Sequence, residues 1–287
     1  MIVDKLTVFC DESLIIANIV LHSYSYELIL LSWFYFAYFM SFHMPLSIID
    51  IFALFTFFIS WSGYTWFARK KAKTTNCIAR SLHQHRIHWM YETITREVRV
   101  GEAALLSNLE RNIAFFASST LLILAGLLTL FAKIDTLEKV ISSMPYADHA
   151  AHLVIQLKLS LLAFIFVLSF FQFTWSMRQY GFVNVMVGAA PIDLSGENEN
   201  LKAYAKQMAI VQDQAAHSYN YGLRSYYFAL AAMCWLFHPI LFMLMSLWVV
   251  YTLYTREFNS KAVKAITAGQ EYLQLERDAK LKNRQPS

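Results

Sequence analysis

The sequence predicts an all-α membrane protein, a polytopic transmembrane helix bundle with five core spans, a possible sixth span near the N-terminus, and cytoplasmic amphipathic helices. Hydrophobic residues make up 57% of the 287 residues, charged residues only 15%, and the mean hydropathy is +0.40. Soluble domains of this length are usually less apolar and more charged. A second observation is the long apolar run between Arg224 and Arg256, which His238 and Pro239 interrupt near its middle.

The interrupted run predicts a hairpin. A straight helix over Tyr226–Tyr254 would be about 44 Å long at about 1.5 Å per residue, while the hydrocarbon core of a bilayer is roughly 30 Å thick. Proline removes a backbone donor and disfavours a helical residue before it, so the chain can reverse there. We therefore predict spans over Tyr219–Phe237 and Pro239–Tyr254. The C-terminal cations then lie on the same side of the membrane as the basic residues after the first span.

Three further spans precede the hairpin, and their flanks orient them. They cover Leu46–Phe67, Ile113–Phe131 and Val154–Trp175. The first span ends in an aromatic belt that is followed by a cationic cluster, Arg69, Lys70, Lys71 and Lys73. Aromatic residues followed by lysine and arginine are typical of a cytoplasmic interface.

Amphipathic segments lie between the spans. Apolar residues recur at three- or four-residue steps over Cys77–Arg111, which predicts a helix that leads into the second span. The third span should continue as a helix through Val187, and a new helix should start after Ser195-Gly196 and lead into the fourth span. The connection around Asp135–Asp148 holds few cations, so we expect a short polar loop on the outer side.

The chain divides into three parts. Residues 1–43 form an N-terminal extension that contains the short apolar segment Leu28–Phe42, which could be an extra span, an interfacial helix or an unstructured lead. Residues 44–261 form the membrane domain, and residues 262–287 form a polar C-terminal tail, of which Gln270–Ser287 is expected to be a frayed helix or tail. The segment Met1–Ser25 lacks the basic start and unbroken apolar core of a signal peptide.

Composition and motifs exclude several classes of function. A net charge of +4 without a basic face argues against a nucleic-acid partner. Three cysteines without a CxxC pair predict neither a disulfide framework nor a metal–thiolate site. We find no GxSxG, HExxH or phosphate-binding glycine loop, so we expect no catalytic residues, no cofactor and no enzyme activity. His83, His85 and His88 do not share one helix face, and we expect no metal site there.

Three ionisable residues are expected inside or at the outer ends of the spans. Asp50 lies about one turn inside the first span, Lys158 about one turn inside the third, and His238 at the hairpin turn. Charged side chains in hydrocarbon are costly, which favours their pairing within the bundle as a candidate intramembrane polar cluster. The alternative is that Lys158 reaches the headgroups and Asp50 favours a helix N-terminus electrostatically.

Basic residues of the amphipathic segments are candidate headgroup contacts. The set is Arg86, Arg96, Arg99 and Arg111. Basic segments beside a membrane attract anionic lipid at roughly 1 kcal/mol per charge. The same residues also fit a purely topological role on the cytoplasmic side.

Several motifs in register resemble one family. They are HQHRIHWM (His83–Met90), FFASSTLLILAGLL (Phe115–Leu128), TWSMRQYGFVNVMVGAAP (Thr174–Pro191), RSYYFALAAMCWLFHP (Arg224–Pro239) and LYTREF (Leu253–Phe258). Together they are similar to the domain of unknown function 599 family of bacterial and plant membrane proteins, over roughly Met44–Lys261. Glu102 and Gln156 depart from the expected pattern. The resemblance implies an integral membrane protein with no assigned activity, and the family-like start at Met44 implies that residues 1–43 are an added element or a non-native start.

These observations favour a non-enzymatic role in the bacterial inner membrane, with the C-terminus in the cytoplasm. The first hypothesis is a scaffold or accessory protein that presents its cytoplasmic helices to membrane lipids or a protein partner. The second is a small channel or carrier for an ion or solute, and the third is a lipid-modifying enzyme. A water-filled path would favour the second hypothesis, and a dry apolar core the first. The sequence leaves the oligomeric state open.

Overall fold

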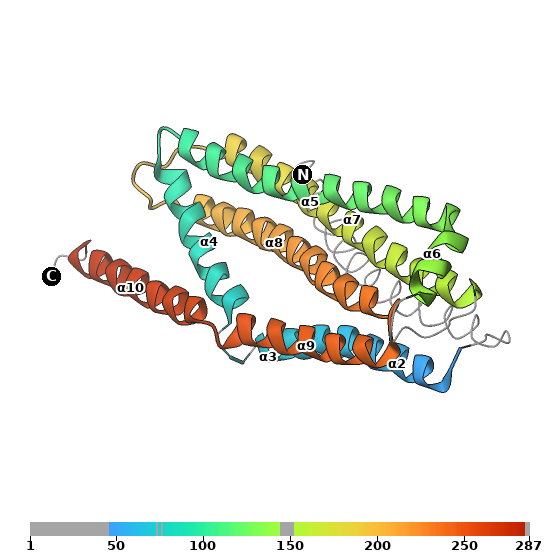
Figure 1. Cartoon of the computed structure of the whole chain (residues 1–287). Helices are drawn as coiled ribbons and strands as arrows, with labels where there is room; N and C mark the ends of the chain where they lie inside the picture. The colour runs from blue at the N-terminus through green and yellow to red at the C-terminus, as the bar shows by residue number, and fades with distance from the viewer. Residues whose placement is uncertain (1–45, 73, 76, 144–151, 285–287) are drawn as a thin grey trace, which may run out of the picture. The chain divides into compact units, whose positions relative to one another are not determined.

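The computed structural model describes residues 46–284, except for residues 73, 76 and 144–151 (Figure 1). Ser47 onwards forms one compact unit, which is all-helical in its described residues, so the predicted all-α class is confirmed. The N-terminal extension and its segment Leu28–Phe42 lie outside the described residues. The elements are α2 (Ile48–Phe58), the π-helical turn η1 (Ile59–Gly63), α3 (Tyr64–Ala72), α4 (Ile78–Thr95), α5 (Val100–Ala132), α6 (Ile134–Ser142), α7 (His152–Ala189), α8 (Glu199–Cys234), α9 (Pro239–Phe258) and α10 (Lys261–Arg284).

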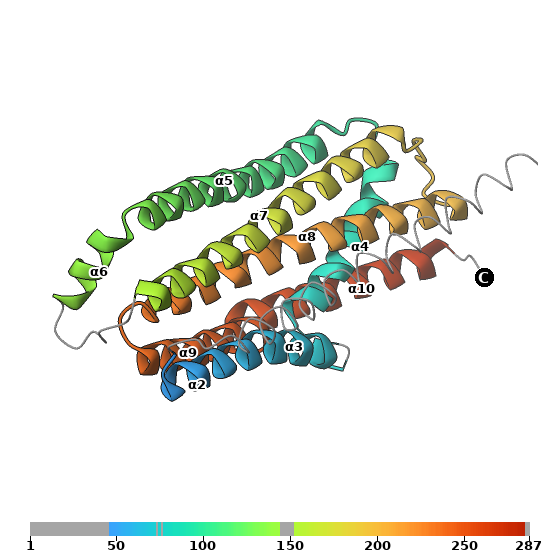
Figure 2. The same cartoon turned by 90° about the vertical axis from the view of Figure 1, so that its right-hand side faces the viewer.

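Four segments of the described chain are long and apolar enough to cross a membrane, judged by length and composition. They are Ile48–Ala72, Val100–Ala132, His152–Ala189 and Pro239–Glu276, and they coincide with four of the five predicted spans, the first of which was predicted to start two residues earlier. The predicted span Tyr219–Phe237 lies in α8, which is not among them. Helix α8 packs against α7, α4 and α9 and lies between α7 and α9 (Figure 2), so protein rather than lipid covers much of its surface.

The predicted reversal of the chain at His238-Pro239 is confirmed. Helix α8 ends at Cys234, α9 begins at Pro239, and the two helices pack side by side. Proline occupies the first helical turn, where its missing donor would have no intrahelical partner. His238 is the N-cap, because its Nδ1 accepts a hydrogen bond of 3.2 Å from the backbone N–H of Ile240. The chain therefore reverses direction at the position of the proline.

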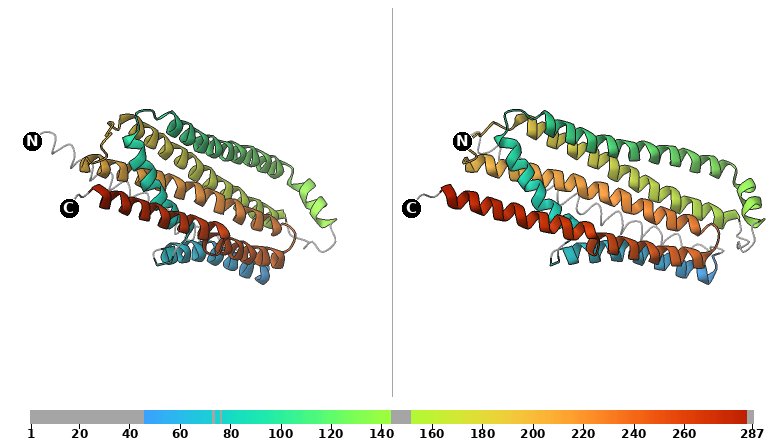
Figure 3. Two further views of the ribbon diagram at one scale, coloured as in Figure 1. Left: turned by 90° about the vertical axis from the view of Figure 1, so that its left-hand side faces the viewer. Right: turned by 60° about the vertical axis from the view of Figure 1, so that its left-hand side comes forward.

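Two predicted segments differ from the structure. The segment Cys77–Arg111 is broken, because Arg96 takes an extended conformation and separates α4 from α5. Helix α4 then crosses the end of the bundle instead of continuing into the second span (Figure 3). The connection after α5, predicted to be a loop, contains α6 (Ile134–Ser142). The C-terminal segment, expected to be a frayed helix or tail, is helical through Arg284, as α10.

Aromatic rings fill the space between the long helices. Phe57 of α2 packs against Phe228 of α8 and Phe242 of α9, with ring centroids 5.7 and 5.0 Å apart. Phe173 of α7 stacks on Phe116 of α5 at 5.5 Å. In contrast, large apolar side chains point outward on α5 and α9, as expected for helices that face lipid: Phe115, Leu122, Leu128, Leu244 and Trp248. The described part of the chain therefore has an aromatic interior and an apolar exterior.

Candidate functional site

A buried indole links two of the three predicted intramembrane residues. Asp50 lies in the first turn of α2, Lys158 in α7, and Trp235 directly after α8, and their exposed fractions are 7%, 3% and 0%. The indole Nε1–H of Trp235 donates a hydrogen bond of 2.7 Å to Oδ1 of Asp50. The Nζ of Lys158 lies 5.4 Å from the centroid of the same ring, which is within the range of a cation–π contact. We call these three residues the Trp235 cluster.

The Trp235 cluster joins three helices through charge and aromatic contact. Its carboxyl and ammonium groups are both removed from solvent, where electrostatic interactions are strengthened by the low dielectric. Phe242 of α9 stacks on Trp235, with centroids 5.3 Å apart, so a fourth helix closes over the indole. The arrangement can hold α2, α7, α8 and α9 in register, and it places two ionisable groups behind aromatic rings.

His238 has a different role from the other two predicted residues. It is half-buried, and its Nδ1 caps α9. Asp50 and Lys158 were recognisable from the sequence, whereas Trp235 was not, because a tryptophan in a long apolar run is typical of hydrophobic packing. A usable signal was present, since a buried indole N–H generally needs an acceptor, and Asp50 is one of few acidic residues in the apolar segments.

A second polar group surrounds Asp213 of α8, outside the predicted spans. Its carboxylate accepts a hydrogen bond from Arg86, lies 3.0 Å from Nδ1 of His83, and lies 3.7 Å from Nε2 of His217. Burial lowers the pKa of His217, and nearby arginines lower it further, while Asp213 opposes the shift. The three arginines are Arg86, Arg224 and Arg69. This group ties α4 to α8.

A third polar group links α8 to α3 and α9. Glu257 accepts hydrogen bonds from Arg224 at 2.7 Å and from the Tyr64 hydroxyl at 2.8 Å. Arg69 donates from Nε to the hydroxyl of Tyr221 at 2.8 Å. In this ion pair the Arg224 side chain is 15% exposed and the Glu257 side chain 16%. Removal of one member would leave the other charge largely buried and without this partner.

Three of the four predicted headgroup arginines are bound within the protein. Arg86 pairs with Asp213, and Arg96 pairs with Glu102 of α5, which is 2% exposed. Arg111 is exposed on α5. Arg99 donates to the carbonyl oxygens of Val187 (2.8 Å), Ala190 (2.6 Å), Pro191 (3.1 Å) and Thr93 (3.0 Å). It therefore caps the C-terminus of α7 and joins that end to α4, while the expected lipid contacts stay a prediction.

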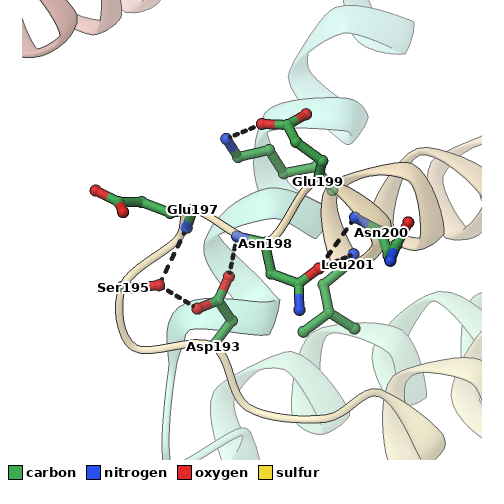
Figure 4. A network of polar contacts seen from close by, with 8 residues as sticks. Asp193, Ser195, Glu197, Asn198, Glu199, Asn200 and Leu201 are labelled. Carbon is green, nitrogen blue, oxygen red and sulfur yellow. Dashed lines mark hydrogen bonds and ion pairs between the residues drawn. The ribbon is translucent and has the colours of Figure 1, made fainter.

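The turn between α7 and α8 is organised by Asp193 (Figure 4). Its carboxylate accepts hydrogen bonds from the Ser195 hydroxyl at 2.6 Å and from the backbone N–H of Asn198 at 3.0 Å, and the Ser195 bond is the main cause that lowers the pKa of Asp193. Gly196 adopts φ of 65°, a left-handed conformation that suits glycine. Asn198 then caps α8 through its Oδ1, which accepts from two backbone N–H groups. The local sequence therefore fixes where α8 starts.

Metal-ligand geometry occurs at one group in the described part of the chain. Asp135, Glu138 and His152 place one possible ligand atom each within 4.8 Å of one another. His83 and His85 do not converge, because His83 contacts Asp213 while His85 lies 3.0 Å from the carbonyl oxygen of Ile266. This group was not recognisable from the sequence, because two of its members lie in α6 and the third lies at the start of α7.

Comparison with known families gives one match. The model of a family described as "Protein of unknown function, DUF599" matches residues 52–262, a range that includes all the motifs from His83 to Phe258. The curated proteins and the solved structures give no match. The match begins within α2 and includes Trp235 and all of α9. Because the family model covers most of the chain, this protein belongs to the DUF599 family.

Proposed function

We propose that this protein is a non-enzymatic scaffold or accessory protein of the bacterial inner membrane. In this proposal it presents a surface made of α4, α10 and the first half of α8 to a protein partner or to lipid headgroups on the cytoplasmic side. We call this surface the α4–α10 platform. The observation that carries the proposal is that these polar helices are packed into a defined arrangement rather than left as separate tails.

Contacts along α4 support an ordered platform. Arg86 donates a hydrogen bond to Asp213 of α8, and the Nδ1 of His83 lies 3.0 Å from the same carboxylate. On the α10 side, the hydroxyls of Ser81 and Thr267 are 2.9 Å apart. Beyond these contacts α10 carries exposed apolar side chains: Tyr272 (73% exposed), Leu273 (43%) and Leu275 (65%). Exposed apolar residues on an otherwise polar helix are typical of a surface that binds a partner.

Charge and helix direction support five crossings with a cytoplasmic C-terminus. Four segments have the length and composition of a span, and α8 reverses into α9 at Pro239. A crossing by α8 needs less apolar surface than the others, because α7 and α9 cover it. With α8 as a crossing, Arg69 to Lys71 after the first span and Lys261 at the start of α10 lie on one side, as the positive-inside rule requires.

Aromatic packing favours this role over a channel or carrier. Phe57, Trp61, Phe228 and Phe242 interlock between α2, η1, α8 and α9, with Trp61 and Phe228 stacked at 5.6 Å. Stacked rings leave little room for hydrated ions, and an aromatic interior rigidifies the bundle. The second candidate function remains a small ion or solute channel, which the buried Asp50 and Lys158 favour.

A crosslinking experiment tests the proposal. A photoreactive amino acid would replace Tyr272 on the platform, and in a control it would replace Trp248, a similarly exposed aromatic residue of α9 (62%). We expect one discrete protein or anionic-lipid adduct from position 272 in cells, and only bulk-lipid adducts from position 248. Equal adduct patterns from the two positions would refute the platform. Uptake of a small ion by liposomes, abolished by Asp50→Asn, would instead favour the channel.

A topology experiment tests the five crossings separately. Reporter domains fused after His238 and after Ser287 should report the outer and the cytoplasmic side, respectively. An outward signal from the fusion after Ser287 would contradict the proposal, because the α4–α10 platform would then lie outside the cell.

A further inference from the structure

The α6–α7 end of the bundle carries a group of three side chains that no part of the proposed function uses. Asp135 lies in the first turn of α6, Glu138 follows one turn later, and His152 is the first residue of α7. Helices α6 and α7 pack against each other there. In Figure 1 this end lies opposite to the one that carries α4 and α10. We propose that these three residues form a binding site for a divalent transition-metal ion, with Zn²⁺ as the preferred ion.

The distances within the group match ligand spacing, and the His152–Glu138 contact is at the same time a long hydrogen bond. The Nδ1 of His152 lies 3.4 Å from Oδ1 of Asp135 and 3.4 Å from Oε2 of Glu138. Ligand atoms held tetrahedrally at about 2.0–2.2 Å from one zinc ion are roughly 3.3–3.5 Å apart. In contrast, N–H···O hydrogen bonds are mostly about 2.7–3.2 Å long. A nitrogen that stands equally far from two carboxylate oxygens fits a shared ion between them.

The charges of the three side chains also favour a divalent cation. Two carboxylates and a neutral imidazole carry two negative charges, which a divalent cation neutralises. The carboxylates are one turn apart on α6 and repel each other without a cation. All three ligand atoms lie within 4.8 Å of one another, and the Asp135 side chain is 85% exposed, so neighbouring side chains leave it room to turn toward an ion.

The ligand types select among divalent ions. Imidazole binds zinc and its transition-metal neighbours, whereas calcium takes six to eight oxygen ligands and magnesium retains most of its waters. Three protein ligands leave a fourth position for water. Glu138 and His152 are about one-third to one-half exposed (37% and 43%), so an ion can reach the site from solvent. The bound ion would tie α6 to the first turn of α7.

Zinc binding by the purified full-length protein tests this proposal. The protein is isolated in detergent through a histidine-free tag, stripped with a chelator, and titrated with Zn²⁺ against a chromophoric competitor. We expect one equivalent of zinc per chain. His152→Gln, and separately the double variant Asp135→Asn with Glu138→Gln, should each weaken binding at least tenfold. Mg²⁺ and Ca²⁺ should not compete at equal concentration.

The matched control is His217→Gln. His217 is similarly exposed (49%) but has one carboxylate, at 3.7 Å, instead of two at 3.4 Å, so its replacement should leave zinc binding unchanged. Zinc should also raise the melting temperature of the wild-type and His217→Gln proteins but not that of His152→Gln. The proposal is overturned if the wild-type protein binds no stoichiometric zinc. Wild-type affinity in both site variants, or equal binding of Mg²⁺, would overturn it as well.

Discussion

The replacement of Trp235 by phenylalanine tests how the Trp235 cluster holds the helices together. Phenylalanine keeps an aromatic ring that can stack on Phe242 but has no N–H group for Asp50. The lost bond is short, at 2.7 Å, and both of its partners are buried. The carboxyl group would then lack its indole donor in a place that water does not easily reach.

The expected loss of stability follows from the type of bond. A hydrogen bond to a charged group contributes about 1.5–3 kcal/mol, and a neutral pair about half as much. Hydrogen bonds between helices in membranes are usually at the lower end of such ranges. We therefore expect Trp235→Phe to cost about 2 kcal/mol in the wild-type protein and about 1 kcal/mol in an Asp50→Asn background. Packing losses from the smaller ring are common to both backgrounds and cancel in the difference.

The assay is unfolding in mixed detergent micelles, followed by circular dichroism so that the tryptophan signal is not needed. Trp248→Phe serves as control, because Trp248 is 62% exposed and its replacement should cost less than about 0.5 kcal/mol. The reasoning is refuted if Trp235→Phe costs the same in both backgrounds, since the indole and the carboxyl group would then not be coupled. A cost equal to that of the control would also refute it.

Three further changes have defined outcomes. Arg99→Lys keeps the charge but loses the branched donor that reaches the end of α7, so it should cost about 1.5–3 kcal/mol and speed hydrogen exchange after residue 187. Gly222→Ala would place a Cβ 2.5 Å from Cε1 of the fully buried Phe173 and should cost about 1–3 kcal/mol in a detergent unfolding assay. In the control Gly126→Ala the new Cβ meets no atom within 4 Å, so this change should be neutral or stabilising. Because the pKa of His217 is lowered in the folded protein, its unfolded form binds protons more readily. The contribution of His217 to stability should therefore be greatest above about pH 6.5 and should fall as the pH drops toward the pKa of the folded form. His217→Gln should remove this part of the pH dependence of unfolding.

Controls make these outcomes decisive. Arg111→Lys changes an exposed arginine of α5 and should leave hydrogen exchange near residue 187 as in the wild type. If Gly222→Ala were as stable as Gly126→Ala, the close approach of α8 to α7 at that position would be incorrect. A pH profile that is identical with and without His217 would mean that another group causes the acid sensitivity.

Local patterns in the sequence predicted most elements of the fold. Pro239 in the middle of an apolar run predicted the reversal between α8 and α9, and His238-Pro239 indeed starts α9. The end of α7 near Gly188 and the restart of a helix after Ser195-Gly196 were likewise visible, because glycine and proline act on the backbone of their own neighbourhood. The exposed apolar surface of the long helices follows from composition alone.

Contacts between distant residues decided what the sequence did not reveal. The amphipathic pattern continues through the break between α4 and α5, so the sequence gives no sign of it. Arg99, which lies in the break, binds carbonyl oxygens at the end of α7, about 90 residues away. Likewise, Asp50 and Trp235 are 185 residues apart. Helix α8 is less apolar than α5, α7 and α9, and neighbouring helices cover much of its surface. These neighbours are known only from the packed bundle.

The sequence by itself determined the class of protein, the position of most helices and the hairpin, because hydrophobic composition and proline geometry act locally. The tertiary structure decided which polar groups meet: Asp50 and Lys158 at one indole, four carbonyls around Arg99, and the Asp135–Glu138–His152 group between α6 and α7. Such meetings depend on how helices pack and turn relative to one another. A side chain's partner is therefore set by the packing of the whole bundle, which no single segment encodes.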